Sequence, residues 1–337
     1  MKEAMFFEKL GDKRVRCYLC RHHCVIGEGK KGICRVRENR GGTLYSLVYR
    51  KLISEHIDPI EKKPLFHFYP GTTSFSVATV GCNFRCLNCQ NYEISQLPAD
   101  SEQIAGSDIE PEKIVEDALN SRCKSIAYTY TEPTIFFEYA YDIAKQADIR
   151  SIKNVFVTNG YITREALATI RPYLHAANID LKSFSPETYR QLSGARLEQV
   201  LDCIRSYREM GIWIEITTLI IPEVNDSASE LRQIAGFIKD TGPGIPWHIS
   251  RFYPAYRLLE KPPTPLNTLK MAREIGLEAG LRYIYIGNVH SEEGENTCCY
   301  NCHKVLIKRY NYQIIENNII NSQCPACKTP IDGCFEV

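Results

Sequence analysis

Eleven of the fifteen cysteines fall into three groups whose spacing is typical of metal binding. The middle group lies in the stretch VGCNFRCLNCQNYEIS and consists of Cys82, Cys86 and Cys89, with no fourth cysteine or histidine nearby. A structural metal site closes its coordination shell, whereas a catalytic site keeps one position open. Three thiolates on a four-iron cluster leave one iron available to a substrate or cofactor. The middle group therefore predicts a catalytic site.

The two other groups supply four cysteines each. Two Cys-x2-Cys pairs, separated by 21 residues, predict a four-sulfur site that favours structural zinc: Cys299, Cys302, Cys324 and Cys327. The first group fits either zinc or an auxiliary iron–sulfur cluster: Cys17, Cys20, Cys24 and Cys34. GEGKKG, inside this first group, matches a dinucleotide-binding fingerprint letter for letter. Because no strand precedes it, we interpret it as a turn of the metal site.

The charge balance and hydropathy exclude several classes of partner. The 337 residues include 41 basic and 40 acidic side chains, so no general attraction to nucleic acid or to an anionic membrane is expected. No apolar run approaches the roughly 20 residues of a membrane-spanning helix, and the first residues lack the pattern of a secretory signal. We therefore expect a cytoplasmic protein, in which clustered thiols bind metal rather than form disulfides.

Short apolar runs that alternate with helical patterns must position these groups. The runs are SFSVATV (74–80), SIAYTY (125–130), NVFVT (154–158), AANIDL (176–181), WIEITTLII (213–221), WHISRFY (247–253) and RYIYIG (282–287). Such runs are typical of parallel strands covered on both faces, and repeated strand–helix units predict an α/β fold. Periodicity alone does not distinguish an open doubly wound sheet from a barrel. The middle cysteines follow the first run, at a strand end where α/β folds place their chemistry.

The flanks lack this alternation. We predict an N-terminal cysteine-rich lobe at residues 1–70, a central α/β domain at 71–290 and a C-terminal knuckle of the zinc-ribbon or rubredoxin type at 291–337. Each flank is too small for a large core of its own, so a bound metal is expected to stabilise it.

Cys-x3-Cys-x2-Cys at this position resembles the radical S-adenosylmethionine (SAM) superfamily. Four further stretches and the terminal cysteine pairs resemble the radical enzyme of the AmmeMemoRadiSam system, which is related to the pyruvate formate-lyase activating enzymes. The stretches are CYLCRHHCVIGEGKKGICRVREN, ISEHIDPIEKKPLFHFYPGT, CQNYEIS and IPEVND. This resemblance covers nearly the whole chain and implies a partial TIM-like (βα)6 barrel rather than a Rossmann sheet.

The resemblance also implies cofactor-binding residues at the ends of later strands. In YTYTEPT, Glu132 would accept a hydrogen bond from the amino group of SAM, and in TNGY, Asn159 would approach the ribose. DLK supplies Asp180 and Lys182, whose side chains point to the same side of the strand because successive residues alternate.

Further positions are implied on the same grounds. His248 corresponds to a histidine near the cofactor in the activating enzymes, although a structural histidine is an equal alternative. Asn88 replaces the usual aromatic residue before the third cysteine, so Tyr92 is the candidate for the adenine contact. Glu215 and Thr217 would face the barrel interior. DPIEKKPLFHF would either cover the barrel mouth and touch substrate or form a charged surface loop.

The implied activity is reductive cleavage of SAM by a 4Fe–4S cluster, which gives a 5′-deoxyadenosyl radical that abstracts hydrogen. The target would be a small molecule or, alternatively, a glycine of a partner protein; a non-catalytic metal-binding protein is the third interpretation. Implied partners are an electron donor such as flavodoxin or ferredoxin and proteins of the AMMECR1 and Memo families. The implied cofactors are the 4Fe–4S cluster, SAM and zinc.

Overall fold

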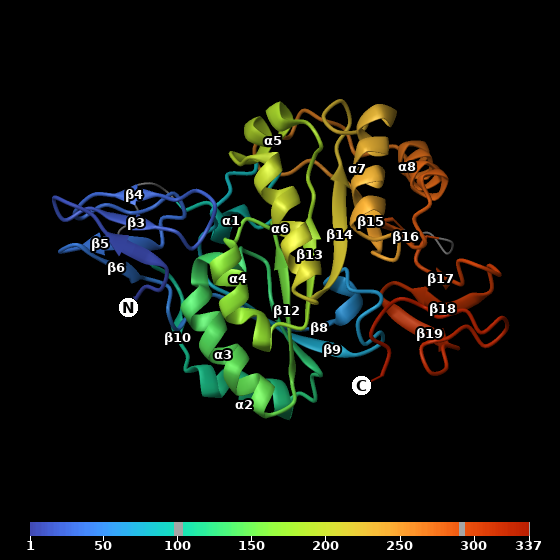
Figure 1. Ribbon diagram of the computed structural model, residues 1–337, viewed down its shortest axis with the longest axis horizontal. Coiled ribbons are helices and arrows are strands. Elements are labelled where there is room, and N and C mark those ends of the chain that lie inside the picture. Colours follow the sequence, from blue (N-terminus) through green and yellow to red (C-terminus); the bar gives the residue numbers. More distant parts are fainter. Residues whose placement is uncertain (98–103, 290–293, 337) are drawn as a thin grey trace.

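The computed structural model describes residues 1–97, 104–289 and 294–336. A central sheet with helices packed against it occupies the middle of the molecule, and two small lobes of short strands lie at opposite ends of the long axis (Figure 1). The N-terminal lobe is drawn in blue and the C-terminal lobe in red. No helix in these ranges has the length and apolar character needed to cross a membrane.

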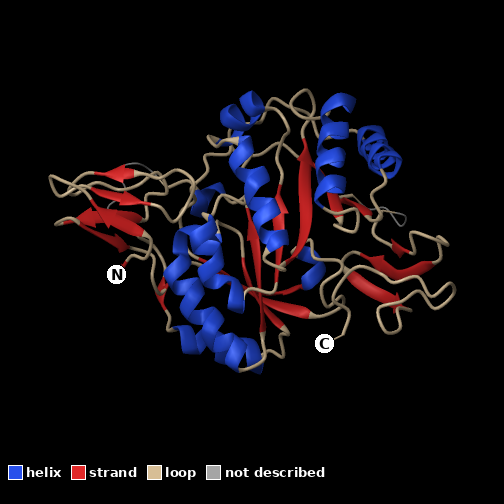
Figure 2. Cartoon of the chain, viewed as in Figure 1, coloured by secondary structure: helices blue, strands red, loops and turns tan. Residues whose placement is uncertain are grey.

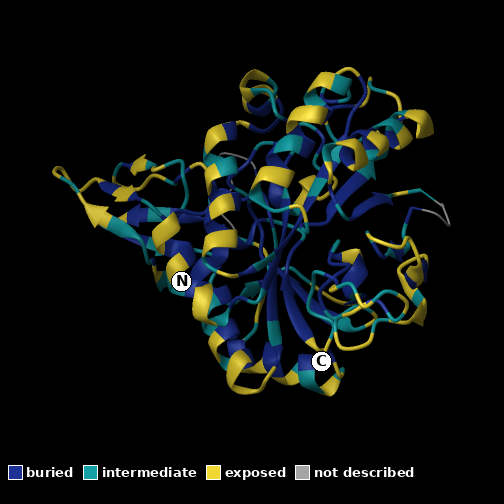
Figure 3. Cartoon of the chain, turned by 45° about the vertical axis from the view of Figure 1, so that its right-hand side comes forward, coloured by how far each residue is buried: buried dark blue, intermediate teal, exposed yellow. Residues whose placement is uncertain are grey.

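Eight strands form the central sheet, and seven consecutive ones run parallel (Figure 2). In spatial order they are β16 (Ile284–Gly287), β15 (Trp247–Arg251), β14 (Trp213–Ile220), β13 (Ala176–Asp180), β12 (Lys153–Thr158), β11 (Ser125–Tyr128), β9 (Thr73–Ala78) and β8 (Ser54–Pro59). β8 pairs antiparallel with β9 at one edge, and β16 is the other edge. The strands are mostly buried, as expected for parallel strands covered on both faces (Figure 3).

In the described residues, helices follow six of the parallel strands, and β16 completes the series. They are α1 (Tyr92–Ser95), α2 (Pro111–Asn120), α3 (Phe137–Ile149), α4 (Arg164–Ile170), α5 (Pro186–Ser193), α6 (Leu197–Glu209), α7 (Ala228–Thr241) and α8 (Leu266–Ala279), with the 3-10 turns η1 (Ile60–Lys62), η2 (Pro133–Phe136) and η3 (Arg171–Tyr173). Local chemistry sets their ends. Ser227 accepts a hydrogen bond from the N–H of Glu230 at the start of α7, and Gly194, at φ +74°, ends α5.

All seven runs that the sequence analysis assigned to strands form parallel strands of this sheet. β8 was not predicted, because SEHIDP carries charged and polar side chains. Its exposed residues fit an edge strand, whose outer backbone groups have no neighbouring strand. β8 belongs to the range assigned to the first lobe, so part of that range joins the central sheet. The predicted boundary at residues 290 and 291 lies outside the described residues.

Short antiparallel strands build the lobes. The N-terminal lobe contains β1 (Lys2–Glu3), β2 (Phe7–Lys9), β3 (Val15–Cys17), β4 (Val25–Ile26), β5 (Arg37–Arg40) and β6 (Thr43–Ser46), and β7 (Lys51–Leu52) pairs with β10 (Ser107–Asp108). The C-terminal lobe, here the tail lobe, contains β17 (Thr297–Cys298), β18 (Val305–Tyr310) and β19 (Gln313–Asn317).

A short segment at residues 64–68, here the floor segment, is bound by side chains from the interior of the sheet. Glu215 of β14 accepts hydrogen bonds from the backbone N–H groups of Phe66 and His67, at 3.0 and 2.8 Å. His248 of β15 contacts the same carboxylate: its Nε2 lies 2.6 Å from Glu215 Oε2, the oxygen that accepts the Phe66 N–H. Both residues stand near the amino-terminal ends of their strands. The Glu215–His248 pair therefore positions backbone.

The tail lobe packs on the floor segment through a buried arginine. Arg309 of β18 is 2% exposed, and it donates hydrogen bonds to the backbone oxygen of Phe66 and to Thr297 Oγ1, both at 2.7 Å. Its guanidinium lies 4.4 Å from the centre of the Phe66 ring, and its Nε lies 3.7 Å from Glu61 Oε1. The Cys334 N–H donates a hydrogen bond to the backbone oxygen of His67, and the backbone oxygen of Cys334 accepts one from the Tyr69 N–H, which continues this contact. The tail lobe and the base of the sheet are thus one packed unit.

His67 is buried in its neutral form between these parts. Its Nδ1 lies 2.6 Å from the backbone oxygen of Asp332, so Nδ1–H donates there, and its Nε2 accepts from the Tyr285 hydroxyl at 2.6 Å. Burial lowers the pKa of His67 to about 4. The unfolded chain would bind this proton near pH 6.5, whereas the folded protein would not.

We therefore expect the free energy of unfolding to fall as the pH is lowered from about 6.5 to about 4, with His67 contributing about 3 kcal/mol of that loss. Urea denaturation at several pH values measures this dependence. The His67→Gln variant should be less stable at neutral pH and should lose stability less steeply over the same window. An unchanged slope in the variant would assign the dependence to other groups.

Candidate active site

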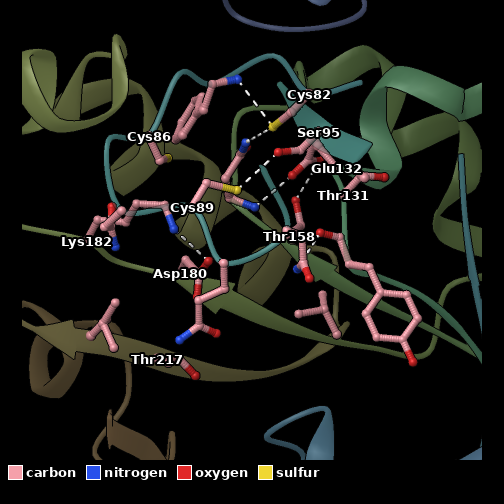
Figure 4. Close-up of a pocket in the computed structure, with 18 of the residues that line it drawn as sticks. Cys82, Cys86, Cys89, Ser95, Thr131, Glu132, Thr158, Asp180, Lys182 and Thr217 are labelled. Atoms are coloured by element: carbon pink, nitrogen blue, oxygen red, sulfur yellow. Dashed lines mark hydrogen bonds and ion pairs between the residues drawn. The ribbon is translucent and has the colours of Figure 1, made fainter. Parts of the chain in front are cut away.

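A cavity of about 340 Å³ lies at the carboxyl ends of the parallel strands. Seven of the nine residues predicted for the cluster and the cofactor pocket line it: Cys82, Cys86, Cys89, Glu132, Asn159, Asp180 and Lys182. They come from four different strand ends, which the parallel topology brings to one edge of the sheet. Figure 4 shows the cysteines along one side of the cavity and Asp180, Lys182 and Thr217 on another.

The three cysteines lie on the loop between β9 and α1. The Phe84 N–H lies 3.4 Å from Cys82 Sγ, and Cys89 Sγ lies 3.1 Å from the Ser95 hydroxyl. Burial raises the pKa of the Cys82 thiol, and it raises that of Cys86 to about 11. These thiols are therefore protonated at neutral pH unless a metal replaces the proton. Sequence reasoning missed Ser95, because no motif marks a hydroxyl six residues after a cysteine.

Glu132 is fully buried and joins two strand ends. Its Oε1 accepts hydrogen bonds from the Thr134 N–H and hydroxyl, at 3.0 and 2.5 Å, and from the Thr158 hydroxyl at 2.8 Å. Its Oε2 accepts the N–H of Asn159 at 2.8 Å, and Glu132 is one of the residues that line the cavity. Burial raises the pKa of Glu132, and these donors oppose the rise. The carboxylate is positioned to accept one further hydrogen bond from a ligand.

The turn after β12 has a conformation that only glycine adopts easily. Gly160 has φ +66°, and a Cβ there would lie 2.8 Å from Ile179 Cγ2. This turn carries Asn159, whose Nδ2 donates to Asn83 Oδ1 at 2.8 Å and lies 3.9 Å from Cys82 Sγ. The strand end is thus connected directly to the cysteine loop.

Two buried amide oxygens at the cavity have no hydrogen-bond partner among the described residues. They are Asn159 Oδ1 and Asn88 Oδ1, and both residues line the cavity. Burying a carbonyl oxygen without a partner costs about 1–3 kcal/mol. A polar ligand with hydrogen-bond donors would remove this cost at both positions.

Asp180 and Lys182 form an ion pair across the cavity wall. Lys182 Nζ lies 2.7 Å from Asp180 Oδ2, as expected for two side chains on the same side of the chain end. Although burial acts to lower it, the neighbouring Asp180 raises the pKa of Lys182, which therefore stays protonated. The lysine places a positive charge near Cys86, where an anionic iron–sulfur thiolate group would be stabilised.

A second buried ion pair lies on the side of the cavity lined by Lys62 and Lys63. Asp58 Oδ2 accepts hydrogen bonds from Lys63 Nζ at 2.6 Å, from the Ser76 hydroxyl at 2.9 Å and from the Tyr130 hydroxyl. Although burial acts to raise it, these donors and Lys62 hold the pKa of Asp58 well below its usual value. Tyr130 has φ +63°, a left-handed value that non-glycine residues rarely adopt. The stretch DPIEKKPLFHF (residues 58–68) is thus divided in two: Lys62 and Lys63 line the cavity, and residues 64–68 form the floor segment. It does not form a single surface loop.

Replacing Asp58 by asparagine should destabilise the protein by about 3 kcal/mol, because Lys63 would then be a buried charge without its partner. Urea denaturation measures the change. Lys62→Ala is the matched control, since Lys62 pairs with the same carboxylate but its side chain is 53% exposed. That control should cost less than about 1 kcal/mol. Equal losses in the two variants would contradict this account of Asp58.

Two predicted cofactor residues do not line the cavity. His248 is two residues before Ser250, a cavity residue on the same strand, and lies one layer deeper against Glu215. In this structure His248 therefore contacts Glu215 and does not line the cavity. Tyr92 is 39% exposed and stacks on Tyr256, with ring centres 4.8 Å apart. Sequence spacing could not place either side chain, because both positions depend on neighbours distant in the chain.

The tail cysteines form a compact second site. Cys299 Sγ lies 3.5 Å from Cys327 Sγ, and Cys302 Sγ lies 3.6 Å from Cys324 Sγ. All four ligand atoms lie within 4.8 Å of one another, an arrangement that could hold a metal ion. A single tetrahedral ion with metal–sulfur bonds of about 2.3 Å requires sulfurs about 3.8 Å apart. The four thiols fit one small cation.

Comparison with known proteins relates these sites to a family. The sequence profile of the Radical SAM superfamily matches residues 76–237, which carry the three cavity cysteines and most of the cavity. An uncharacterized protein of Methanocaldococcus jannaschii is 48% identical over 335 residues, covering 98% of this chain and 99% of that protein. This chain belongs to the radical SAM superfamily.

Two further similarities are more distant. A second protein of M. jannaschii, provisionally named as a glycyl-radical enzyme activating enzyme, is 25% identical to this radical SAM protein over 225 residues, covering 64% of this chain and 78% of that protein. The crystal structure of Streptococcus suis SuiB bound to S-adenosylmethionine has a TM-score of 0.51 at 14% identity, covering 68% of this chain and 53% of SuiB. The latter similarity supports the fold alone.

Membership in the superfamily implies a 4Fe–4S cluster and SAM, and the residues present fit both. Among the described residues that line the cavity, three are cysteines and none is a histidine, so a cluster would keep one iron open. The unpartnered oxygens of Asn88 and Asn159, and the carboxylate of Glu132, supply acceptors for the donors of SAM. Lys182 supplies positive charge beside the thiolates.

Proposed function

We propose that this protein is a radical SAM enzyme that acts on a small polar substrate. Cys82, Cys86 and Cys89 would hold the 4Fe–4S cluster in the cavity. When bound and reduced, this cluster supplies the electron that cleaves SAM into methionine and a 5′-deoxyadenosyl radical, which removes a hydrogen atom from the substrate. The observation that carries the proposal is the open three-cysteine group in a cavity with unpartnered polar atoms.

The chain's own residues would bind SAM and exclude water. Glu132 would accept the hydrogen bond of the amino group, because Glu132 lines the cavity and its Oε2 has a hydrogen bond from Asn159 N–H alone among the described residues. Asn159 would be oriented by Asn83 and would offer its free Oδ1 to the cofactor. The sequence resemblance that suggested these roles also implies a partial TIM-like barrel. We therefore propose that the central sheet is such a barrel.

Substrate would bind in the rest of the cavity. Thr217, Ser250 and Asn288 contribute hydroxyl and amide groups there, and Lys62 and Lys63 line another part. These groups suit a small molecule with several polar atoms. Activation of a partner protein is the second candidate, because one relative carries the name of a glycyl-radical enzyme activating enzyme.

Other parts of the proposal concern metals, partners and location. We propose zinc for Cys299, Cys302, Cys324 and Cys327, since their sulfur separations fit a single tetrahedral ion. An electron donor of the flavodoxin or ferredoxin type would reduce the cluster. Association with AMMECR1- and Memo-family proteins rests on the sequence resemblance, and a cytoplasmic location rests on composition.

Anaerobic reconstitution with iron and sulfide, followed by reduction with dithionite in the presence of SAM, tests the activity. The natural protein should form 5′-deoxyadenosine, and the Cys82→Ala/Cys86→Ala/Cys89→Ala variant should form none. Cys123→Ala is the matched control, because Cys123 is a buried cysteine outside the three groups. Absence of product from the reconstituted natural protein would overturn the proposal.

The substrate class is tested separately. Deuterium transferred from a labelled metabolite into 5′-deoxyadenosine would support a small-molecule substrate. A glycyl radical signal in electron paramagnetic resonance (EPR) that appears only when a candidate protein is added would instead support the activating function.

A further inference from the structure

One part of the active-site cavity, here the lysine wall, is lined by Lys62, Lys63 and Tyr130. All three side chains donate hydrogen bonds to the carboxylate of Asp58. Asp58 itself is 4% exposed and is not among the described residues that line the cavity, so its carboxylate lies behind the donors. The lysine wall therefore contributes two cationic side chains to the cavity, while the carboxylate that they share stays outside the lining.

The charges at the lysine wall do not balance. Lys62 Nζ lies 2.9 Å from Asp58 Oδ1, and Lys63 Nζ lies 2.6 Å from Asp58 Oδ2, so two ammonium groups share one carboxylate. Neither lysine has a second acidic partner within ion-pair distance in the part of the chain that the structure describes. An excess of one positive charge therefore remains beside the cavity.

The other carboxylates of the cavity have partners of their own. Among the described lining residues they are Glu132 and Asp180. Asp180 pairs with Lys182 at 2.7 Å, and Glu132 accepts hydrogen bonds from Thr158 and from the N–H of Asn159. The lysine wall is therefore suited to a bound molecule that brings one negative charge.

Lys63 shows the effect of this imbalance most clearly. Its side chain is 2% exposed, and of its three N–H donors one bonds to Asp58 Oδ2 and one lies 3.5 Å from the Tyr130 hydroxyl. Burial lowers the pKa of Lys63, and Lys62 adds to this effect although Asp58 opposes it. A second anion beside Lys63 would pair the third donor and would stabilise the charged form of the lysine.

We propose that the substrate carries a carboxylate group and that Lys62 and Lys63 bind it. This inference rests on the proposed function and names the chemical class of its substrate. A carboxylate has the single negative charge that balances the lysine wall, whereas a phosphate monoester carries nearly two near neutral pH. Lysine ammonium groups bind such an anion as point charges, with hydrogen bonds strengthened by the charge.

The lysine wall is connected to the loop that carries the cluster cysteines. Asn91, two residues after Cys89, donates a hydrogen bond from its Nδ2 to the backbone oxygen of Tyr130 at 2.8 Å. Glu132, the proposed acceptor for the amino group of SAM, follows Tyr130 by two residues. A carboxylate held at the lysine wall would therefore place the rest of the substrate beside the cofactor, where a C–H bond would face the radical.

A deuterium-labelled metabolite extract tests the substrate class. Cells that make this protein are grown in deuterium oxide, and their small-molecule extract is added to the reconstituted protein with dithionite and unlabelled SAM. A C–D bond of the substrate breaks and its deuterium joins the 5′ carbon of the deoxyadenosyl radical, so singly deuterated 5′-deoxyadenosine reports turnover. Treatment of the extract with carbodiimide and ammonium chloride, which converts carboxylates into uncharged amides of nearly the same shape, should abolish this label. Alkaline phosphatase should leave it.

The outcomes separate this inference from the proposed function. Label that survives the carbodiimide treatment, or label that phosphatase abolishes, would overturn the carboxylate while the proposed function stands. If the protein forms 5′-deoxyadenosine with dithionite but no deuterium passes from the untreated extract, the small-molecule function fails and the carboxylate fails with it.

Variants of Lys62 test the binding residue. Lys62→Gln should raise the amount of extract needed for half-maximal labelling about 10- to 100-fold, because a hydrogen bond between charged groups is lost, and Lys62→Arg should restore it to within about threefold. Lys113→Gln is the matched control, because Lys113 is similarly exposed and pairs with an aspartate four residues away but does not line the cavity. Equal effects of the two glutamine variants would overturn the assignment, as would an equal loss of SAM binding in Lys62→Gln.

Discussion

Replacing Glu132 by glutamine is expected to weaken SAM binding about 100-fold, which corresponds to roughly 3 kcal/mol. The carboxylate accepts hydrogen bonds from Thr134, Thr158 and Asn159, so every neighbouring group is a donor. A glutamine amide would turn one N–H toward these donors and would also lose the negative charge that we propose faces the amino group of SAM. Equilibrium binding of SAM to the reconstituted protein measures the effect.

Thr131→Ala is the control for this experiment. Thr131 lines the same cavity, but its hydroxyl donates to the backbone oxygen of Thr79. This variant should bind SAM within about threefold of the natural protein, since no charge is lost. The Glu132 variant must retain its iron, because its cysteines are unchanged. SAM binding that is equal in the two variants would remove Glu132 from the cofactor site.

Removal of two tail cysteines should unfold the tail lobe. Cys299 and Cys324 are fully buried and form part of a small core with Leu306 and Ile307. Because this core is small, its apolar packing cannot replace the stabilisation that the proposed zinc would give. Structural zinc sites contribute on the order of 10 kcal/mol to folding in small domains. The Cys299→Ala/Cys324→Ala variant should lack zinc and should be cleaved rapidly by protease after residue 294.

We also expect the rest of the protein in this variant to melt at a lower temperature than in the natural protein. Unfolding of β18 would withdraw Arg309 and leave Glu61, which is fully buried, without its positive neighbour. Cys298→Ser is the matched control, because Cys298 is adjacent but its thiol is not in the four-sulfur group. Native protease resistance and an unchanged melting curve in the double variant would show that the tail lobe folds without metal.

The parts of the fold that were predictable are those fixed by local sequence. The seven apolar runs are long, are rich in β-branched and aromatic residues, and are buried on both faces, so they form strands as predicted. The strand ends then determine which residues meet. Asp180 and Lys182 are two residues apart and line one cavity with cysteines about a hundred residues earlier in the chain, because parallel strands end at one edge.

The parts that were not predictable depend on partners distant in sequence. His248 contacts Glu215 because the floor segment places Phe66 and His67 against that carboxylate, and no pattern around residue 248 encodes this neighbour. β8 has the composition of a charged loop and becomes a strand only because β9 offers a free edge.

The contact between the floor segment and the tail lobe determines when the active site can be completed. The floor segment directly follows Lys62 and Lys63, which line the cavity, and it is held by Arg309 and Cys334 near the other end of the chain. A ribosome synthesises the strands and the cysteine loop long before it reaches those residues. During synthesis the cavity wall therefore lacks this support until the tail lobe has been made and has folded. Folding of the tail lobe would thus control completion of a site that begins near residue 60.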